Sequence, residues 1–143
     1  MKITDGHLKQ IYTHAAETYP CECFGFLVGV FEQGGAVHRV VRGANLHTAR
    51  TDRFEMDPQE FVQVEKQAGD AGLDVIGFYH SHPDWPPIPS QNDLALAWEG
   101  MHYLIVSVHE GRPLSAGVWS LAEGDLKRFA QEPLEILDEA AMG

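Results

Sequence analysis

The sequence is poor in cysteine, with only Cys21 and Cys23 among its 143 residues. On extended backbone these two side chains would share a face, but a disulfide across a single intervening residue would close a strained ring. We therefore expect two reduced thiols, which are typical of cytoplasmic proteins. A Cys-x-Cys pair can also bind a metal ion, but alone it is a weak indication of a metal site.

Basic residues are scarce as well. Ten lysines and arginines stand against 21 aspartates and glutamates, which gives a formal net charge of −11. Nucleic acid requires a basic surface that neutralises phosphate, and anionic membranes attract basic segments. The charge argues against both partners and leaves two explanations open, namely solubility or a basic partner protein or peptide tail.

Long hydrophobic runs are absent too. No segment has the length needed to span a bilayer, and residues 1–10 are too polar for a signal peptide. With 44% apolar residues, the chain has the composition of a globular protein and the size for one core without disulfides. We expect a single domain over residues 1–143.

The remaining patterns predict alternating helices and strands. Apolar residues at helical spacing predict helices over residues 3–19, 57–72 and 90–98. Apolar and β-branched runs predict strands over residues 24–31, 36–42, 53–56, 73–79, 103–108 and 114–121, while residues 127–137 fit either type. Trp98 and Trp119 lie on apolar faces, and we expect both in the core. The order of elements predicts an α/β fold with a mixed, partly antiparallel sheet packed with helices.

Two histidines follow the 73–79 segment directly, in the sequence His80-Ser81-His82-Pro83. Because side chains alternate along a strand, His80 and His82 should point to the same side. Pro83 has no N–H for the ladder and should end the strand. The chain contains eight histidines, so a His-x-His pair alone is equally consistent with ordinary surface or core residues.

Ser90 and Asp93 lie beyond a proline-rich loop that contains Trp85. Ser90 should begin a helix, which places both side chains in its first turn. A serine followed by an acidic residue at +3 is usually a helix cap. Two imidazoles and one carboxylate also form a common ligand set for catalytic zinc, with the fourth position left for water. Because a strand, a rigid loop and a helix follow one another here, a metal site is a better explanation of these four residues than a coincidence of composition.

The spacing of this stretch resembles a known signature. His80-Ser81-His82-Pro83, six residues, Ser90, two residues and Asp93 match the motif of the JAMM (MPN-plus) zinc metallopeptidases without a gap or substitution. The resemblance runs from the first helix to the terminal strands. It implies the JAMM/MPN fold, a cytidine-deaminase-like α/β fold.

A second, upstream segment, residues 20–29, resembles the part of that family that carries a glutamate, which here is Glu22. The residues alone favour a solvated charge at Glu22, and the resemblance reverses this interpretation. In one departure, Phe24 stands directly before Gly25, where small bacterial members often carry a cysteine.

The resemblance implies one zinc ion per chain, held by His80, His82 and Asp93. It implies that Glu22 stays off the metal, accepts a proton from the attacking water and passes it to the leaving amine. Ser90 would donate a hydrogen bond to the oxygen on which negative charge develops. The implied reaction is metal-assisted hydrolysis of an amide or isopeptide bond, without a covalent intermediate.

JAMM enzymes act on ubiquitin-like proteins, at or after the C-terminal Gly-Gly. The chain has no room for the insertions of eukaryotic deubiquitinating members and resembles small bacterial ones, which implies a ubiquitin-fold sulfur carrier as partner. Two segments are candidates for binding an extended tail or, alternatively, for packing: the edge formed by Arg53, Phe54, Glu55 and Met56, and the loop residue Trp85. Whether the chain forms a homodimer is left open.

Two other functions deserve comparison. A non-catalytic MPN-type interaction scaffold is the main alternative, but such relatives typically lose one or more metal ligands, and all are present here. RadC-type relatives share a similar His-x-His-Pro motif in a nucleic-acid-associated setting. They carry a helical region like those that bind DNA, which this chain lacks, and the acidity disfavours that role.

Overall fold

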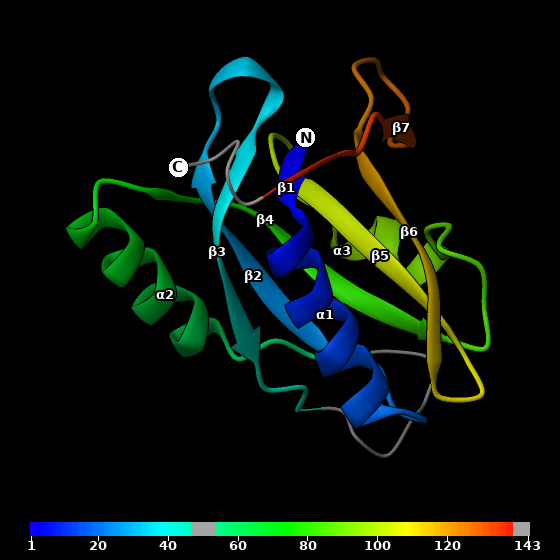
Figure 1. Ribbon diagram of the computed structural model, residues 1–143. Coiled ribbons are helices and arrows are strands. Elements are labelled where there is room, and N and C mark those ends of the chain that lie inside the picture. Colours follow the sequence, from blue (N-terminus) through cyan, green and yellow to red (C-terminus); the bar gives the residue numbers. More distant parts are fainter. Residues whose placement is uncertain (47–53, 139–143) are drawn as a thin grey trace.

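The computed structural model describes residues 1–46 and 54–138, and within them eight strands form one sheet in the order β7-β6-β5-β4-β2-β3-β1-β8 (Figure 1). The strands are β1 (Lys2–Thr4), β2 (Phe24–Val30), β3 (Ala36–Gly43), β4 (Asp74–Pro83), β5 (His102–His109), β6 (Arg112–Leu121), β7 (Phe129–Glu132) and β8 (Glu135–Leu137). The helices are α1 (Asp5–Thr18), α2 (Pro58–Asp70) and α3 (Gln91–Leu96), and η1 (Glu32–Gly34) is a short 3-10 helix. Strand β4 runs parallel to β5 and antiparallel to β2. The predicted α/β class with a mixed sheet is confirmed.

The sheet separates two hydrophobic clusters. Helix α1 lies across one face (Figure 1) and packs on a cluster that includes Ile76 and Tyr79 of β4. Helix α2 packs on the other cluster, which includes Phe78. Because side chains alternate along β4, His80 and His82 lie on the same side as Phe78. The candidate ligands are therefore on the α2 side of the sheet.

Helix α1 begins later than the predicted segment 3–19, because the short strand β1 precedes it. Lys2 pairs with Ala36 of β3 and with Glu135 of β8. The Thr4 side chain caps the helix by accepting a hydrogen bond from the His7 N–H at 3.1 Å. A strand of three residues is too short to show a periodicity of its own. Helix α2 begins as predicted, with Asp57 at the cap and Pro58 at the first position.

Strand β4 continues beyond the predicted segment 73–79 and ends at Pro83, the residue expected to stop it. The histidines remain in the ladder because β4 pairs with β5 along its whole end: His80 lies opposite Ile105 and His82 opposite Ser107. They are thus held by a paired strand in the middle of the sheet, which fixes their direction more firmly than a loop would.

Residues 54–56 are not a strand, so the prediction for 53–56 is wrong in its described part, and Arg53 lies outside the described residues. The Leu46 N–H donates to the Glu55 carbonyl at 2.9 Å, but the Glu55 N–H donates to the Asn45 side chain, also at 2.9 Å. A side-chain acceptor replaces a backbone one at this point, so a regular ladder does not continue.

Residues 127–137 contain the two short strands β7 and β8. Trp119 is half-buried against the α2-side cluster, but Trp98 is 43% exposed, so its predicted place in the core is wrong. Helix α3 ends at Leu96, before it can carry Trp98 inward.

No helix of the described residues is long and apolar enough to cross a membrane.

Candidate metal centre

The imidazoles of His80 and His82 converge, as the alternation along β4 predicts. Both side chains are buried, and their Nε2 atoms lie 3.2 Å apart. The His80 ring also packs against Phe54, with 4.9 Å between ring centroids. Two nitrogen atoms that can bear lone pairs therefore face a common point at the end of the sheet.

Helix α3 brings a carboxylate to the same point. Ser90 is its N-cap, and the two residues form a capping box: Ser90 Oγ accepts from the Asp93 N–H at 3.0 Å, and Asp93 Oδ2 accepts from the Ser90 N–H at 2.9 Å. Asp93 Oδ1 lies 3.1 Å from His80 Nε2, and Oδ2 lies 3.0 Å from His82 Nε2. The sequence left a helix cap and a metal ligand as alternative roles for Asp93, and the geometry is compatible with both roles at once.

A carbonyl group sets the tautomer of His82. Its Nδ1 lies 2.9 Å from the Pro86 carbonyl oxygen. That oxygen can only accept, so Nδ1 carries the proton of the neutral ring and Nε2 carries a lone pair. Metal-binding histidines usually donate their other N–H to a carbonyl or carboxylate in this way.

The Asp93 carboxylate is held in its charged form. Burial alone would raise the pKa of Asp93, but the neighbouring His80 and the hydrogen bond from the Ser90 N–H hold that pKa below its usual range. A carboxylate oxygen and an imidazole lone pair at 3.0 Å repel each other unless a proton or a cation lies between them.

The donor set fits a zinc ion. Tetrahedral zinc lies about 2.0–2.1 Å from nitrogen and oxygen ligands, which separates the ligand atoms by roughly 3.3 Å. The two Nε2 atoms are 3.2 Å apart, Asp93 Oδ1 is 3.1 Å from His80 Nε2, and Asp93 Oδ2 is 3.0 Å from His82 Nε2. Their chemistry, two imidazoles and one carboxylate, also suits zinc.

Glu22 lies beside this group although it is far away in the sequence. Its side chain is only 4% exposed, and Glu22, His80 and His82 each offer a ligand atom within 4.8 Å of one another. The structure brings together all four residues that sequence reasoning had singled out as ligands or general base.

The segment that carries Glu22 is fixed by two polar residues that sequence analysis did not single out. Ser81 Oγ accepts from the Cys23 N–H at 2.8 Å, and the Ser81 N–H donates to the Cys23 carbonyl at 3.2 Å. Asn45 Nδ2 donates to the Glu22 carbonyl at 3.0 Å. Ser81 lies between the two histidines in sequence, so its side chain points to the opposite face of β4. This alternation is the only sequence feature that indicates its position.

Both cysteines are thiols, as expected. Burial raises the pKa of Cys23 to about 11, although Ser81 and Thr18 oppose the shift through hydrogen bonds. A thiol with this pKa stays protonated near neutral pH, whereas metal binding requires the thiolate.

A pocket of about 230 Å³ adjoins His80 and Asp93. Its wall is mostly aromatic and includes Phe54, Glu55 and Met56 of the predicted tail-binding segment, together with Trp98. Trp85 is not part of this wall; its side chain is 68% exposed on the loop after β4. Trp98 was missed as a lining residue because its apolar surroundings had indicated a core position.

Comparison with known proteins gives consistent matches over most of the chain. Residues 4–120 match the model of a family described as prokaryotic homologs of the JAB domain. The chain is 36% identical over 119 residues to the desampylase of Haloferax volcanii, which covers 81% of this chain and 82% of the relative. It is 30% identical over 100 residues to a probable TtuB-protein conjugate cleaving protease of Thermus thermophilus, which covers 70% and 65%.

Solved structures agree in fold. The solution structure of a Desulfitobacterium hafniense protein is 27% identical and superposes with a TM-score of 0.83, covering 96% of this chain and 93% of that one. A structure described as a metalloprotease-like JAMM zinc site in the proteasome and signalosome has a TM-score of 0.58 at 22% identity, covering 96% and 98%. At this identity the second match shows the fold alone.

Proposed function

The chain belongs to the family of prokaryotic homologs of the JAB domain, and on this premise we propose that it is a zinc-dependent isopeptidase of the JAMM type. Its reaction is hydrolysis of an amide bond at or after the C-terminal Gly-Gly of a ubiquitin-like protein. We propose a ubiquitin-fold sulfur carrier as the substrate and one zinc ion per chain.

One observation carries this proposal. The Nε2 atoms of His80 and His82 lie 3.2 Å apart, and each has one Asp93 carboxylate oxygen at 3.0–3.1 Å. The His82 tautomer and the Asp93 charge leave lone pairs directed at one another. A buried acid, Glu22, stands within 4.8 Å of the histidine donors. A group of this kind is costly to bury without a cation and is well suited to hydrolysis with one.

Zinc held by His80, His82 and Asp93 would supply the Lewis-acid chemistry that makes water nucleophilic near neutral pH. Glu22 is the general base and then the general acid: its carboxylate accepts the proton from water and delivers it to the leaving amine. Ser81 and Asn45 hold the peptide group between Glu22 and Cys23, which limits the movement of the Glu22 backbone before substrate arrives.

Ser90 is the proposed donor to the carbonyl oxygen of the scissile bond. Its Oγ already accepts from the Asp93 N–H, which fixes the oxygen and leaves the hydroxyl hydrogen available to donate. Removal of one such donor typically lowers turnover by about 100- to 1000-fold.

The substrate proposal draws on the relatives and the pocket. The names of two relatives refer to a desampylase and to a protease that cleaves TtuB-protein conjugates, which supports an isopeptide bond to a small modifier as the target. Phe54, Met56 and Trp98 line an apolar pocket beside His80, which suits a nonpolar side chain upstream of the Gly-Gly.

The direct test incubates zinc-loaded protein with a Gly-Gly-extended sulfur carrier and, separately, with di-ubiquitin, and reads intact masses. We expect cleavage of the sulfur-carrier substrate after Gly-Gly and loss of that cleavage when Glu22 is replaced. Binding of the carrier without cleavage, by a protein shown to contain zinc, would contradict the proposal and favour the scaffold function.

A further inference from the structure

The proline-rich loop that follows β4 is held by side chains from three neighbouring strands. Three consecutive carbonyl groups of the loop each accept one side-chain hydrogen bond. These are Trp85 O from Ser107 Oγ of β5 at 2.6 Å, Pro86 O from His82 Nδ1 of β4 at 2.9 Å, and Pro87 O from Trp119 Nε1 of β6 at 3.0 Å.

The start of the loop is also held at Asp84, whose N–H donates to the Val108 carbonyl at 2.6 Å and whose carboxylate accepts from the Glu110 N–H at 2.9 Å. The three carbonyl bonds matter most in the proline-rich part that follows.

Pro86, Pro87 and Pro89 have no backbone N–H, so the carbonyl oxygens are the main backbone groups that can anchor this segment. The side chains of Trp85 and Ile88 are 68% and 58% exposed, so apolar burial does not anchor it either.

The middle bond of the three, between His82 and Pro86, determines the tautomer of the candidate ligand His82. Pro86 O fixes the His82 proton on Nδ1 and directs Nε2 toward Asp93 and His80. The position of this carbonyl depends on the peptide groups before and after it, which Ser107 and Trp119 hold.

We propose that Ser107 and Trp119 are positioning residues of the metal centre. They keep the Pro86 carbonyl in place and thereby set the tautomer and orientation of His82. The inference rests on the proposed function, in which His82 binds zinc, and it extends the set of functional residues to β5 and β6, which carry none of the candidate ligands.

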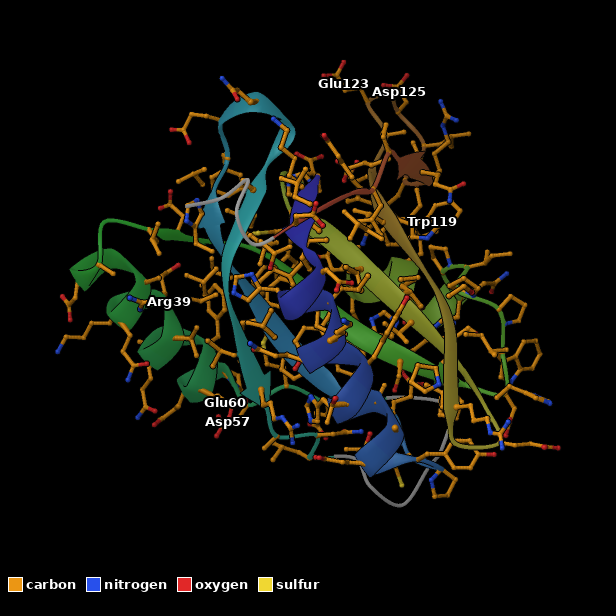
Figure 2. The ribbon with its side chains drawn as sticks, viewed as in Figure 1. Arg39, Asp57, Glu60, Trp119, Glu123 and Asp125 are labelled. Atoms are coloured by element: carbon orange, nitrogen blue, oxygen red, sulfur yellow. The ribbon has the colours of Figure 1, made fainter. Side chains whose placement is uncertain are left out.

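Gly117 gives independent support from the same strand as Trp119. The two residues share a face of β6, and a Cβ added at Gly117 would lie 3.1 Å from Trp119 Nε1 and 3.2 Å from Pro87 O. These two atoms are the donor and acceptor of the hydrogen bond. Glycine therefore leaves the space in which the Trp119 side chain, placed on β6 in Figure 2, reaches the loop.

The main alternative is that Trp119 only packs. Its ring is half-buried against the α2-side cluster, and a purely packing role would be affected by loss of the ring but not of its N–H. Trp119→Phe keeps an aromatic ring and removes the donor. Gly117→Ala keeps the tryptophan but crowds its bond, Ser107→Ala removes the hydroxyl, and Ser107→Thr keeps it.

The experiment measures the zinc dissociation constant of each variant by competition with a chelator, and the ¹⁵N shifts of the His82 ring in metal-free protein. Loss of a direct partner of a metal-binding histidine typically weakens metal binding about 10- to 100-fold. Ser107 and Trp119 act one peptide group further away than a direct partner. We therefore expect the zinc dissociation constant to increase about three- to tenfold in Trp119→Phe, Gly117→Ala and Ser107→Ala, and to stay near that of the unchanged protein in Ser107→Thr. The metal-free variants should also show a larger share of the Nε2–H tautomer.

Two matched controls come from the same region. Trp85→Phe changes an exposed ring on the loop itself, and Ser115→Ala removes an exposed hydroxyl opposite Ser107 in the β5–β6 ladder. Both should bind zinc within about twofold of the unchanged protein. Excess zinc should restore kcat of Trp119→Phe with KM unchanged.

The inference is overturned if Trp119→Phe and Ser107→Ala keep both the zinc affinity and the His82 tautomer, or if the controls lose as much affinity. Should Trp119→Phe fail to fold, Gly117→Ala and Ser107→Ala still decide the question. An unchanged protein that binds no zinc would refute the proposed function instead, while the metal-free ¹⁵N shifts would still test the positioning of His82.

Discussion

At the scale of single residues, Asp93 is both part of a helix cap and the proposed third zinc ligand. Its Oδ2 accepts the Ser90 N–H as part of a capping box and also lies 3.0 Å from His82 Nε2. The helix cap therefore holds the carboxylate in place before any ion binds. Pre-arranged ligands lose less conformational freedom on binding, so the helix start contributes to the readiness of the site.

The first prediction concerns the proposed ligands. His80→Ala, His82→Ala and Asp93→Ala should each reduce zinc content measured by metal analysis from one ion per chain to nearly none, because two remaining donors cannot hold the ion in competition with water. His38→Ala, which changes an exposed histidine on β3, is the control and should keep its zinc. Full zinc content in any of the three ligand variants would show that the ligand set is different.

The second prediction separates the base from the ligands. Glu22→Gln keeps the size of the side chain but cannot accept a proton, so we expect zinc content near one per chain and turnover lower by about 100- to 10,000-fold. Steady-state cleavage and metal analysis on the same preparation give both values. Loss of zinc in Glu22→Gln would instead place Glu22 among the ligands, as its distance of at most 4.8 Å from the histidine donors would permit.

At the scale of elements, β4 organises the molecule by presenting different chemistry on its two faces. His80 and His82 face the α2 side, whereas Tyr79 faces α1, where its hydroxyl lies 2.7 Å from His14 Nδ1. Burial lowers the pKa of His14 to about 4, and the positive charge of Arg42 adds to that shift. Burial also raises the pKa of Tyr79, so this contact joins two neutral rings at neutral pH.

The third prediction follows from the lowered pKa of His14. The unfolded chain takes up the proton near the ordinary pKa of 6.5, while the folded chain resists it until about 4. Stability should therefore be fully present above about pH 6.5 and should fall between pH 6.5 and 4, with a slope of up to about 1.4 kcal/mol per pH unit from this residue.

Urea unfolding of chelated, metal-free protein at several pH values measures this slope without interference from zinc release. His14→Gln should flatten the pH dependence over the same window, whereas His38→Gln, at an exposed position, should not. An equal slope in His14→Gln and the unchanged protein would mean that other groups cause the acid sensitivity.

The elements also show which parts of the fold were predictable from sequence. Long, regular segments such as β2, β6 and α2 were predicted because their periodicity reports burial directly. Strand β1 was missed because it is defined by its partners β3 and β8, which lie far away in the sequence. The strand predicted at 53–56 failed in its described part because Asn45 accepts the Glu55 N–H that a ladder would need.

For the site, the motif spacing indicated His80, His82, Ser90 and Asp93, and the resemblance to JAMM enzymes added Glu22. The roles of Ser81, Asn45 and Trp119 depend on contacts across 58, 23 and 32 residues. Hydrogen bonds of this kind leave no local pattern, so a single sequence does not reveal them. The cytoplasmic location and the single domain stay predictions.

At the scale of the whole molecule, the net charge of −11 includes acidic side chains on separate parts of the surface. Glu123 and Asp125 lie beyond the end of β6, whereas Asp57 and Glu60 lie at the start of α2, on another part of the molecule (Figure 2). A distributed negative field acts at long range and speeds the approach of a positively charged partner, and salt screens it.

The fourth prediction is that a substrate with a basic tail shows a salt-dependent KM. Raising ionic strength from about 50 to 300 mM should increase KM several-fold and leave kcat nearly unchanged, because screening affects encounter more than chemistry. A substrate whose tail lysines and arginines are replaced by glutamine should show little of this dependence. Equal salt dependence for both tails would exclude steering by the protein's charge.

If Asp93 is both the cap residue and the proposed zinc ligand, this double role limits how the proposed enzyme could evolve into a binding protein. A descendant that gave up hydrolysis by replacing Asp93 would lose half of the capping box of α3 along with the metal, whereas replacement of His80 would leave that helix start intact. Inactivated descendants should therefore retain the aspartate more often than the histidines, because the aspartate still caps α3.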